Sequence, residues 1–235
     1  MRPQPSRARW ARDATPSSAG ERGIALVVAA VLVLLVGGGY WVVRSQQPRR
    51  PLHLLEAYDI SGSVGPDEKQ RDCEVAEATH ARILGANSRV MAWTFALEAW
   101  ELYEGDPRDA RELRPLLDTI RGTTAQLRGT SPARVIERMA AAARRAEAEN
   151  ADVALLFLWD GEDHRPEATR AAVQQLTALS NLKAIWVVGV PADSQGKDLR
   201  ARVRETFAPL PVPLIISGPF DRGPGLEAFQ RALHR

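Results

Sequence analysis

From residue 52 onward, short apolar runs alternate with stretches of helical periodicity, and this alternation constrains the fold more than any other feature. The apolar runs, which look like buried strands, cover residues 52–58, 89–95, 153–159, 182–190 and 212–217. The stretches between and after them with helical periodicity cover about residues 67–84, 107–121, 131–148, 165–180, 196–207 and 223–234. Repeated strand–helix–strand units predict an α/β fold, with a mostly parallel central sheet and helices on both of its faces.

One further strand is expected at an edge of that sheet. Residues 99–105 alternate apolar and polar side chains, as a half-exposed strand does. They follow the run at 89–95 after only a short gap, so the two segments can pair in antiparallel fashion. We therefore expect residues 52–235 to form a Rossmann-like domain with one antiparallel edge strand.

Residues 23–43 contain no charged side chain, and no face of this stretch is polar. A helix of this length crosses ~30 Å of hydrocarbon at ~1.5 Å per residue. The stretch is longer than the apolar core of a cleavable signal peptide, and residues 37–40 make a poor cleavage sequence. We therefore expect an uncleaved signal anchor, a single transmembrane helix at 23–43, with cleavage as the alternative.

Arginine is unequally distributed around this apolar stretch. Five arginines precede it within residues 1–22, and three follow it within residues 44–50. Because basic residues tend to stay in the cytoplasm, the N-terminus is expected inside and the later domain outside. The predicted organisation is a disordered cytoplasmic tail at 1–22, the membrane helix at 23–43, a polar linker at 44–51 and an extracytoplasmic domain at 52–235.

The net charge of +2 does not indicate nucleic-acid binding once it is divided by segment. Residues 1–50 hold eight of the 31 basic residues and two of the 29 acidic ones, which leaves 23 basic and 27 acidic residues from residue 51 onward. A domain that neutralises phosphates needs a basic face, so we expect no nucleic-acid partner. Cys73 is the only cysteine, so no intrachain disulfide can form.

Oxygen-bearing side chains occur at three points where the carboxyl ends of parallel strands should meet. They are Asp59, Ser61 and Ser63 in "DISGS", Thr130 in "RGTS" and Asp160 in "WDGED". Ligands of open α/β sheets bind at this edge. Alternate residues of extended backbone point the same way, so the three "DISGS" side chains are expected to approach one ion. Hard oxygen donors favour Mg²⁺, with Mn²⁺ or Ca²⁺ as alternatives, over zinc.

Each of these pieces also has a local explanation. "DISGS" can form an Asx-type turn that leads into the next helix, Thr130 can cap a helix, and Asp160 with Gly161 can form an ordinary turn after a strand. Residues 162–164 are interpreted as a solvated loop. The tryptophans in or beside the strand runs are expected to be packing residues: Trp93, Trp100, Trp159 and Trp186.

The motifs "DISGS", "GT" at 129–130 and "DG" at 160–161, in this order on an α/β pattern, resemble the metal-ion-dependent adhesion site of the von Willebrand factor type A family. The resemblance covers residues 52–235 and implies a divalent ion held directly by the two serines and Thr130, with the two aspartates often acting through water. It also implies a protein partner whose Asp or Glu carboxylate completes the site. The family usually has Thr where Trp159 stands and Gly where Arg128 stands, and both departures affect what can approach the ion.

We therefore predict a membrane-anchored binding module rather than an enzyme. A haloacid-dehalogenase-type phosphatase needs a second Asp where Ser61 lies, and a Gly-Asp-Ser-Leu hydrolase needs His where Asp163 lies. Residues 60–65 also lack the nucleophile elbow of α/β-hydrolases. Two alternatives stay open: a constitutive structural subunit of a membrane complex, and a hydrolase in which Ser63 is activated by one of the histidines, namely His53, His80, His164 or His234.

Overall fold

The computed structural model describes residues 50–124, 129–192 and 198–234. The predicted tail at 1–22, the predicted membrane helix at 23–43, residues 44–49 of the linker and Arg128 lie outside the described residues. Within the described ranges, no helix has the length and apolar character needed to cross a bilayer. Arg50 and Pro51 already contact the domain. The Asp152 amide donates a hydrogen bond of 2.8 Å to the Pro51 carbonyl oxygen, and the Arg50 guanidinium lies 3.8 Å from the Asp152 carboxylate.

Six strands form one sheet in the order β3-β2-β1-β4-β5-β6. The strands are β1 (Leu52–Asp59), β2 (Ser88–Phe95), β3 (Ala99–Gly105), β4 (Asp152–Leu158), β5 (Leu182–Val188) and β6 (Leu214–Ser217). All neighbouring strands are parallel except β2 and β3, which are antiparallel. The predicted mostly parallel sheet with one antiparallel edge strand is therefore confirmed.

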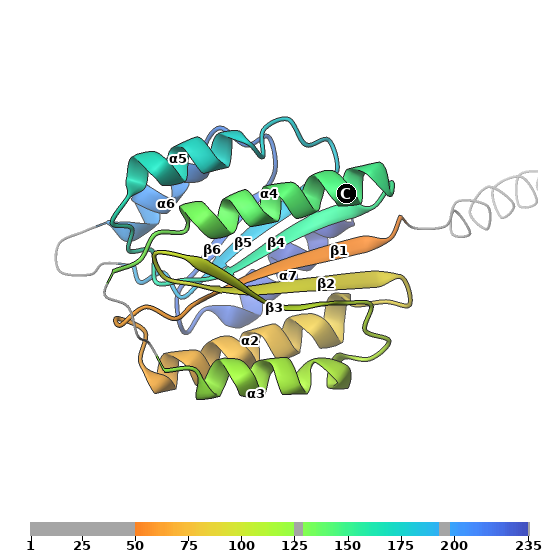
Figure 1. Cartoon of the computed structure of the whole chain (residues 1–235), viewed down its shortest axis with the longest axis horizontal. Coiled ribbons are helices and arrows are strands. Elements are labelled where there is room, and N and C mark those ends of the chain that lie inside the picture. Colours follow the sequence, from red (N-terminus) through yellow and green to blue (C-terminus); the bar gives the residue numbers. More distant parts are fainter. Residues whose placement is uncertain (1–49, 125–128, 193–197, 235) are drawn as a thin grey trace, which may run out of the picture. The chain divides into compact units, whose positions relative to one another are not determined.

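The helices cover both faces of the sheet (Figure 1). Helices α4 (Ala133–Ala148), α5 (Pro166–Gln174) and α6 (Leu199–Phe207) lie on one face. On the other face lie α2 (Pro66–Ile83), α3 (Arg114–Gly122), which follows the 3₁₀ turn η1 (Ala110–Leu113), and α7 (Arg222–Leu233). Helix α5 ends earlier than the periodicity to residue 180 predicted. The backbone continues there in turns with i to i−3 hydrogen bonds, which still bury Leu176 and Leu179.

The core has two layers because the side chains of each central strand alternate between the faces. In β4, Val153, Leu155 and Phe157 pack with α4, α5 and α6, while Ala154, Leu156 and Leu158 pack toward α2, α3 and α7. Since both faces are covered, these strands are apolar without alternation, as the sequence suggested. Each large side chain that is fully buried contributes roughly 1.5–3 kcal/mol.

Three polar side chains are buried inside the layer under α2. Glu56 of β1 is fully buried, accepts a hydrogen bond of 2.9 Å from the Tyr58 hydroxyl and lies 2.6 Å from Nε2 of His80. Burial raises the pKa of Tyr58 well above its ordinary value, and the adjacent Glu56 carboxylate raises it further. The group links β1 to α2 at a point where an unpaired carboxylate would be costly.

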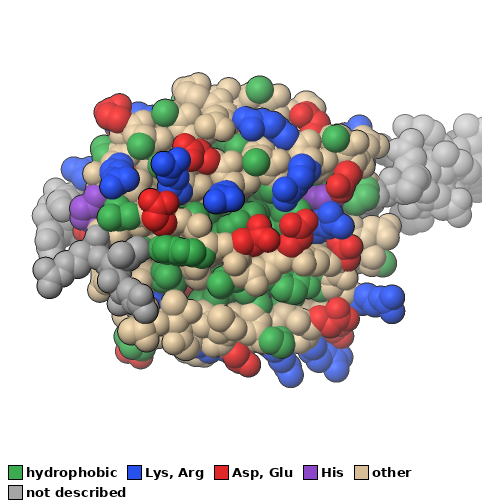
Figure 2. Space-filling model, viewed as in Figure 1, with side chains coloured by type: hydrophobic (Ala, Val, Ile, Leu, Met, Phe, Trp, Pro, Cys, Tyr) green, Lys and Arg blue, Asp and Glu red, His purple; other side chains and the backbone are tan. Residues whose placement is uncertain are grey.

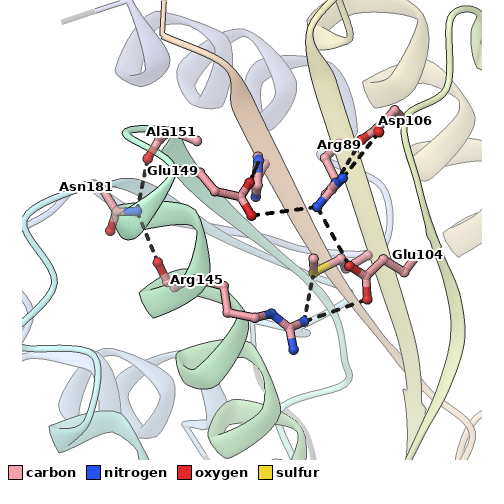
Figure 3. Close-up of polar contacts among 10 residues, drawn as sticks. Arg89, Glu104, Asp106, Arg145, Glu149, Ala151 and Asn181 are labelled. Atoms are coloured by element: carbon pink, nitrogen blue, oxygen red, sulfur yellow. Dashed lines mark hydrogen bonds and ion pairs between the residues drawn. The ribbon is translucent and has the colours of Figure 1, made fainter.

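A network of charged side chains surrounds the amino end of β1 (Figure 3). Arg89 of β2 forms ion pairs with Asp106, Glu104 and Glu149, and Arg145 of α4 pairs with Glu104. Figure 2 shows basic and acidic side chains interspersed on the visible face.

Candidate metal centre

Strand β1 ends at Asp59, and the chain turns at once toward α2. The Oδ1 atom of Asp59 accepts a hydrogen bond of 2.8 Å from the Ser61 amide, and the Ser61 carbonyl accepts one of 3.1 Å from Val64. "DISGS" is therefore an Asx-type turn, and the expectation of extended backbone from Asp59 to Ser63 was wrong. The side-chain carboxylate bonds the main chain two residues on, and this folds the segment back on itself.

This turn nevertheless brings the predicted side chains together. Oγ of Ser61 lies 2.9 Å from Oγ of Ser63, and Ser63 donates a hydrogen bond of 2.9 Å to Oδ2 of Asp160. Asp160 follows β4, which is the parallel neighbour of β1, and its Oδ1 accepts from the Glu162 amide at 2.8 Å. Asp59, Ser61, Ser63 and Asp160 thus form one hydrogen-bonded chain across two adjacent strand ends.

Thr130 is held at the same edge by main-chain hydrogen bonds. Its amide donates to Nδ1 of His164 at 3.0 Å, and its carbonyl accepts from the His164 amide at 2.8 Å. Gly129 precedes it with φ +93°, a conformation in which a side chain would be strained. No hydrogen bond among the described residues joins Thr130 to the other four side chains. Its hydroxyl does not cap α4, which has no side-chain cap, so the local explanation of Thr130 was wrong.

Two oxygens of the predicted ligand set are buried without a hydrogen-bond partner among the described residues. They are Oδ2 of Asp59 and Oγ1 of Thr130. Buried polar atoms are usually hydrogen-bonded. Oγ of Ser131, next to Thr130, is unpartnered as well, as are several buried atoms elsewhere in the described residues. A divalent cation would satisfy the Asp59 and Thr130 oxygens, and in this respect the residues fit the predicted ion.

The two carboxylates are also in an environment that disfavours negative charge. Burial raises the pKa of Asp59 from 3.8 to about 8, and the nearby Asp160 carboxylate contributes in the same direction. Burial likewise raises the pKa of Asp160. A cation beside them would oppose both effects, because an opposite charge favours the ionised form.

The ligand set is poor in charge and rich in hydroxyls. Among the residues that the structure describes, no three His, Cys, Asp or Glu side chains form a ligand cluster, and the predicted site combines two carboxylates with three hydroxyls.

Ser63 contacts Ser61 and Asp160 rather than a histidine. His80 is bound to Glu56, and His53 is paired with Glu149 at the other end of the sheet. A serine–histidine pair at Ser63 is therefore not formed in the described part of the chain.

Residues 162–164 are half-buried to exposed, as expected of a solvated loop, and they also make specific contacts. The indole of Trp159, which is buried, donates a hydrogen bond of 2.8 Å to the Glu162 carbonyl oxygen. His164 binds Thr130 through both its ring and its amide. The sequence analysis missed this positioning role of His164.

Of the four tryptophans expected to pack, Trp93, Trp159 and Trp186 are buried, but Trp100 on the edge strand β3 is 43% exposed.

Solved structures share this fold, whereas no protein-family model matches the chain and no curated protein matches it. A von Willebrand factor type A protein from Catenulispora acidiphila aligns with 79% of this chain at 17% identity and a TM-score of 0.55. The fold is that of a von Willebrand factor type A domain. An aerotolerance-related membrane protein from Bacteroides fragilis aligns over 78% of this chain and 98% of its own, at 17% identity and a TM-score of 0.56.

A third structure with this fold has a metal-ion-dependent adhesion site. The proximal thread matrix protein 1 of the mussel byssus, in which this site is occupied by zinc, covers 79% of this chain at 14% identity and a TM-score of 0.52. The present chain spans less than half the length of the mussel and Catenulispora proteins, 44% and 42% respectively. Identities this low show the shared type A fold alone.

Proposed function

We propose that this chain is a non-catalytic type A binding module that engages a protein partner through a divalent cation. The cation would be held by the oxygens of Asp59, Ser61, Ser63, Thr130 and Asp160. The single observation that carries the proposal is the pair of buried, unpartnered oxygens on Asp59 and Thr130. The zinc-occupied adhesion site of the mussel protein supports the same type of site.

The donor set explains why a partner would bind. Two carboxylates and three neutral hydroxyls leave little excess negative charge around a divalent ion, so the set favours one further anionic ligand. A carboxylate of Asp or Glu on another protein supplies that ligand. Hard oxygen donors favour Mg²⁺, with Mn²⁺ and Ca²⁺ as alternatives, when these ions are available.

The proposal includes anchoring in a membrane through residues 23–43, with the N-terminus in the cytoplasm and the type A domain outside. Its support is the absence of charge in that stretch and the excess of arginine before it. Site-directed cysteine labelling tests this topology. A cysteine introduced at position 150 should react with a membrane-impermeant maleimide in intact cells, whereas one introduced at position 10 should not. Equal reactivity at both positions would contradict it.

The test of the binding function compares Asp59→Ala with Asp67→Asn in the full chain. Asp67 is an exposed acid a few residues downstream in the first turn of α2, so it controls for loss of charge. Asp59→Ala should remove the Mg²⁺-induced rise in thermal midpoint and the capture of partners in Mg²⁺, and Asp67→Asn should retain both. Capture that persists unchanged in excess chelator would instead support the constitutive structural subunit.

A further inference from the structure

The outer edge of β6 carries no charged side chain, unlike the other edge of the sheet. β6 ends the sheet on the side opposite β3, and no strand of the described residues pairs with its outer side. No charged residue lies between Glu205 and Asp221, and this is the longest uncharged stretch in residues 51–235. Proteins commonly protect an edge strand from pairing with another chain by placing charges, bulges or prolines on it. The lack of charge here is typical of an edge that another strand covers.

The direction of the main chain in β6 shows which of its groups are free. The Pro213 carbonyl accepts a hydrogen bond of 3.0 Å from the Ile185 amide of β5. Because main-chain groups alternate in direction along a strand, those of Ile215 also face β5, whereas those of Leu214 and Ile216 point away from the sheet. Prolines precede β6, but the main chain of Pro213 faces β5, so its ring does not obstruct the outer edge.

The side chains of β6 are apolar on both faces of the sheet. Leu214, Ile215 and Ile216 are all half-buried. Leu214 and Ile216 pack on the side of α6, and Ile215 packs on the side of α7. A strand that paired with this edge would therefore bind the free main-chain groups and also cover apolar side chains on both faces, which is favourable.

The geometry of this edge is complementary to itself. Leu214 and Ile216 lie at equal distances from Ile215 along the strand. A two-fold axis at Ile215 would therefore pair two copies of β6 in antiparallel fashion, with Leu214 of each copy opposite Ile216 of the other. Opposite residues whose main chains face each other exchange both N–H···O bonds. Apolar side chains would meet across the strands, and no like charges would be opposed.

The other edge of the sheet is protected, which favours a closed pair over an open series of sheets. The register between β2 and β3 is irregular at Ala92 and Trp93, as at a bulge. Glu101 and Glu104 are exposed on β3. Bulges and exposed charges both oppose the addition of a strand. Pairing of β6 with β3 of a further copy, which would build an open filament, is therefore disfavoured.

We propose that the outer edge of β6 is the contact surface for a second copy of this chain, in a two-fold dimer whose sheets are continuous through an antiparallel pair of β6 strands. β6 has only four residues, so the contact is small, and the dimer belongs to the reversible class of assemblies. The pairing involves neither β1 nor β4, whose ends carry the proposed ion site. The inference is therefore independent of the proposed function.

Disulfide trapping in the full chain tests this pairing and its register. In the dimer, Ile215→Cys places two thiols at a non-hydrogen-bonded pair, where Cα atoms lie ~4.5 Å apart, a separation that a disulfide spans. Mild oxidation of the purified variant should therefore yield a disulfide dimer on a non-reducing gel. Leu214→Cys is the matched control, because its two copies would lie diagonally, roughly 7–8 Å apart, which is too far for a disulfide. The native chain is a second control, since Cys73 is buried.

A mixture of Leu214→Cys and Ile216→Cys chains should also form the disulfide dimer, because these residues are directly opposite in the proposed pair. Equal yields from Ile215→Cys and from Leu214→Cys alone would indicate random collision or association through another part of the chain, and would overturn the pairing. Absence of the dimer from Ile215→Cys, or from the mixture, would overturn it as well. In a cell lysate, a disulfide between Ile215→Cys and a different protein in place of the dimer would overturn the second copy as the occupant.

Discussion

Replacing Thr130 by Val separates the metal-ligand role of its hydroxyl from any structural role. Thr130 is 1% exposed, and its Oγ1 has no hydrogen-bond partner among the described residues. Burying an unpaired hydroxyl costs ~1–3 kcal/mol, whereas an apolar group of the same shape avoids that cost. Without metal, Thr130→Val should therefore be more stable than the native chain by at least ~1 kcal/mol. For a domain of this size this raises the thermal midpoint by ~2–4 °C.

The same substitution should have the opposite effect on ion binding. An ion at ten times its dissociation constant stabilises the native chain by ~1.4 kcal/mol, which raises its midpoint by ~3–6 °C. Thr130→Val should lose most of this rise because it removes one of the oxygens proposed to bind the ion directly. The assay is thermal unfolding of the full chain, followed by circular dichroism, in EDTA and in Mg²⁺.

The matched control is Thr79→Val, because Thr79 is fully buried but its hydroxyl donates a hydrogen bond of 2.7 Å to the Val75 carbonyl oxygen. That substitution should not stabilise the protein, and it should leave the Mg²⁺ shift intact. Two results for Thr130→Val would refute the reasoning. A lower midpoint in EDTA would mean that the hydroxyl makes a hydrogen bond within the protein, and an undiminished Mg²⁺ shift would mean that it is not a ligand.

Three further predictions concern the site and its supporting residues. In EDTA the free energy of unfolding should fall as pH rises from about 4 to 8. The folded chain keeps a proton on Asp59, whose pKa is about 8, whereas the unfolded chain has lost that proton. Urea unfolding at stepped pH should show this slope, and Asp59→Asn should flatten it. His164→Ala should weaken Mg²⁺ binding about tenfold in a calorimetric titration, as loss of a residue that orients a ligand does, whereas Arg165→Ala should not; equal affinity in both variants would argue against positioning by His164. His80→Ala should lower the free energy of unfolding by ~3–5 kcal/mol in urea, because it leaves the buried Glu56 carboxylate without its nearest partner. A loss below ~1 kcal/mol would show that the contact between His80 and Glu56 does not stabilise the fold.

The fold could be predicted from sequence because its signals are local. Each strand starts and ends within about two residues of an apolar run, and the antiparallel edge strand at 99–105 has the expected bounds. Parallel order then places residues after β1 and β4 at a common edge. For this reason Asp59 and Asp160 could be assigned to one site without knowledge of any contact between them.

Other features depend on geometry that residue patterns do not encode. Whether "DISGS" is extended or turned depends on one hydrogen bond from Asp59 to the Ser61 amide. The role of His164 depends on contacts with Thr130, which lies 34 positions earlier in the chain. The structure itself shows the relation, since a Cβ added at Gly129 would lie 3.6 Å from the His164 ring. The exposure of Trp100 follows from its place on an edge strand, where one side of the residue lacks a neighbouring strand.

The central position of β1 has a mechanical consequence. The chain enters the sheet at the amino end of β1, where Pro51 is already hydrogen-bonded to Asp152. The proposed ion site lies at the carboxyl end of β1, roughly 25 Å away at 3.3 Å per residue. A tensile load applied between residue 50 and a bound partner would act along β1. It would shear the parallel hydrogen bonds to β2 and β4 together rather than opening them one after another.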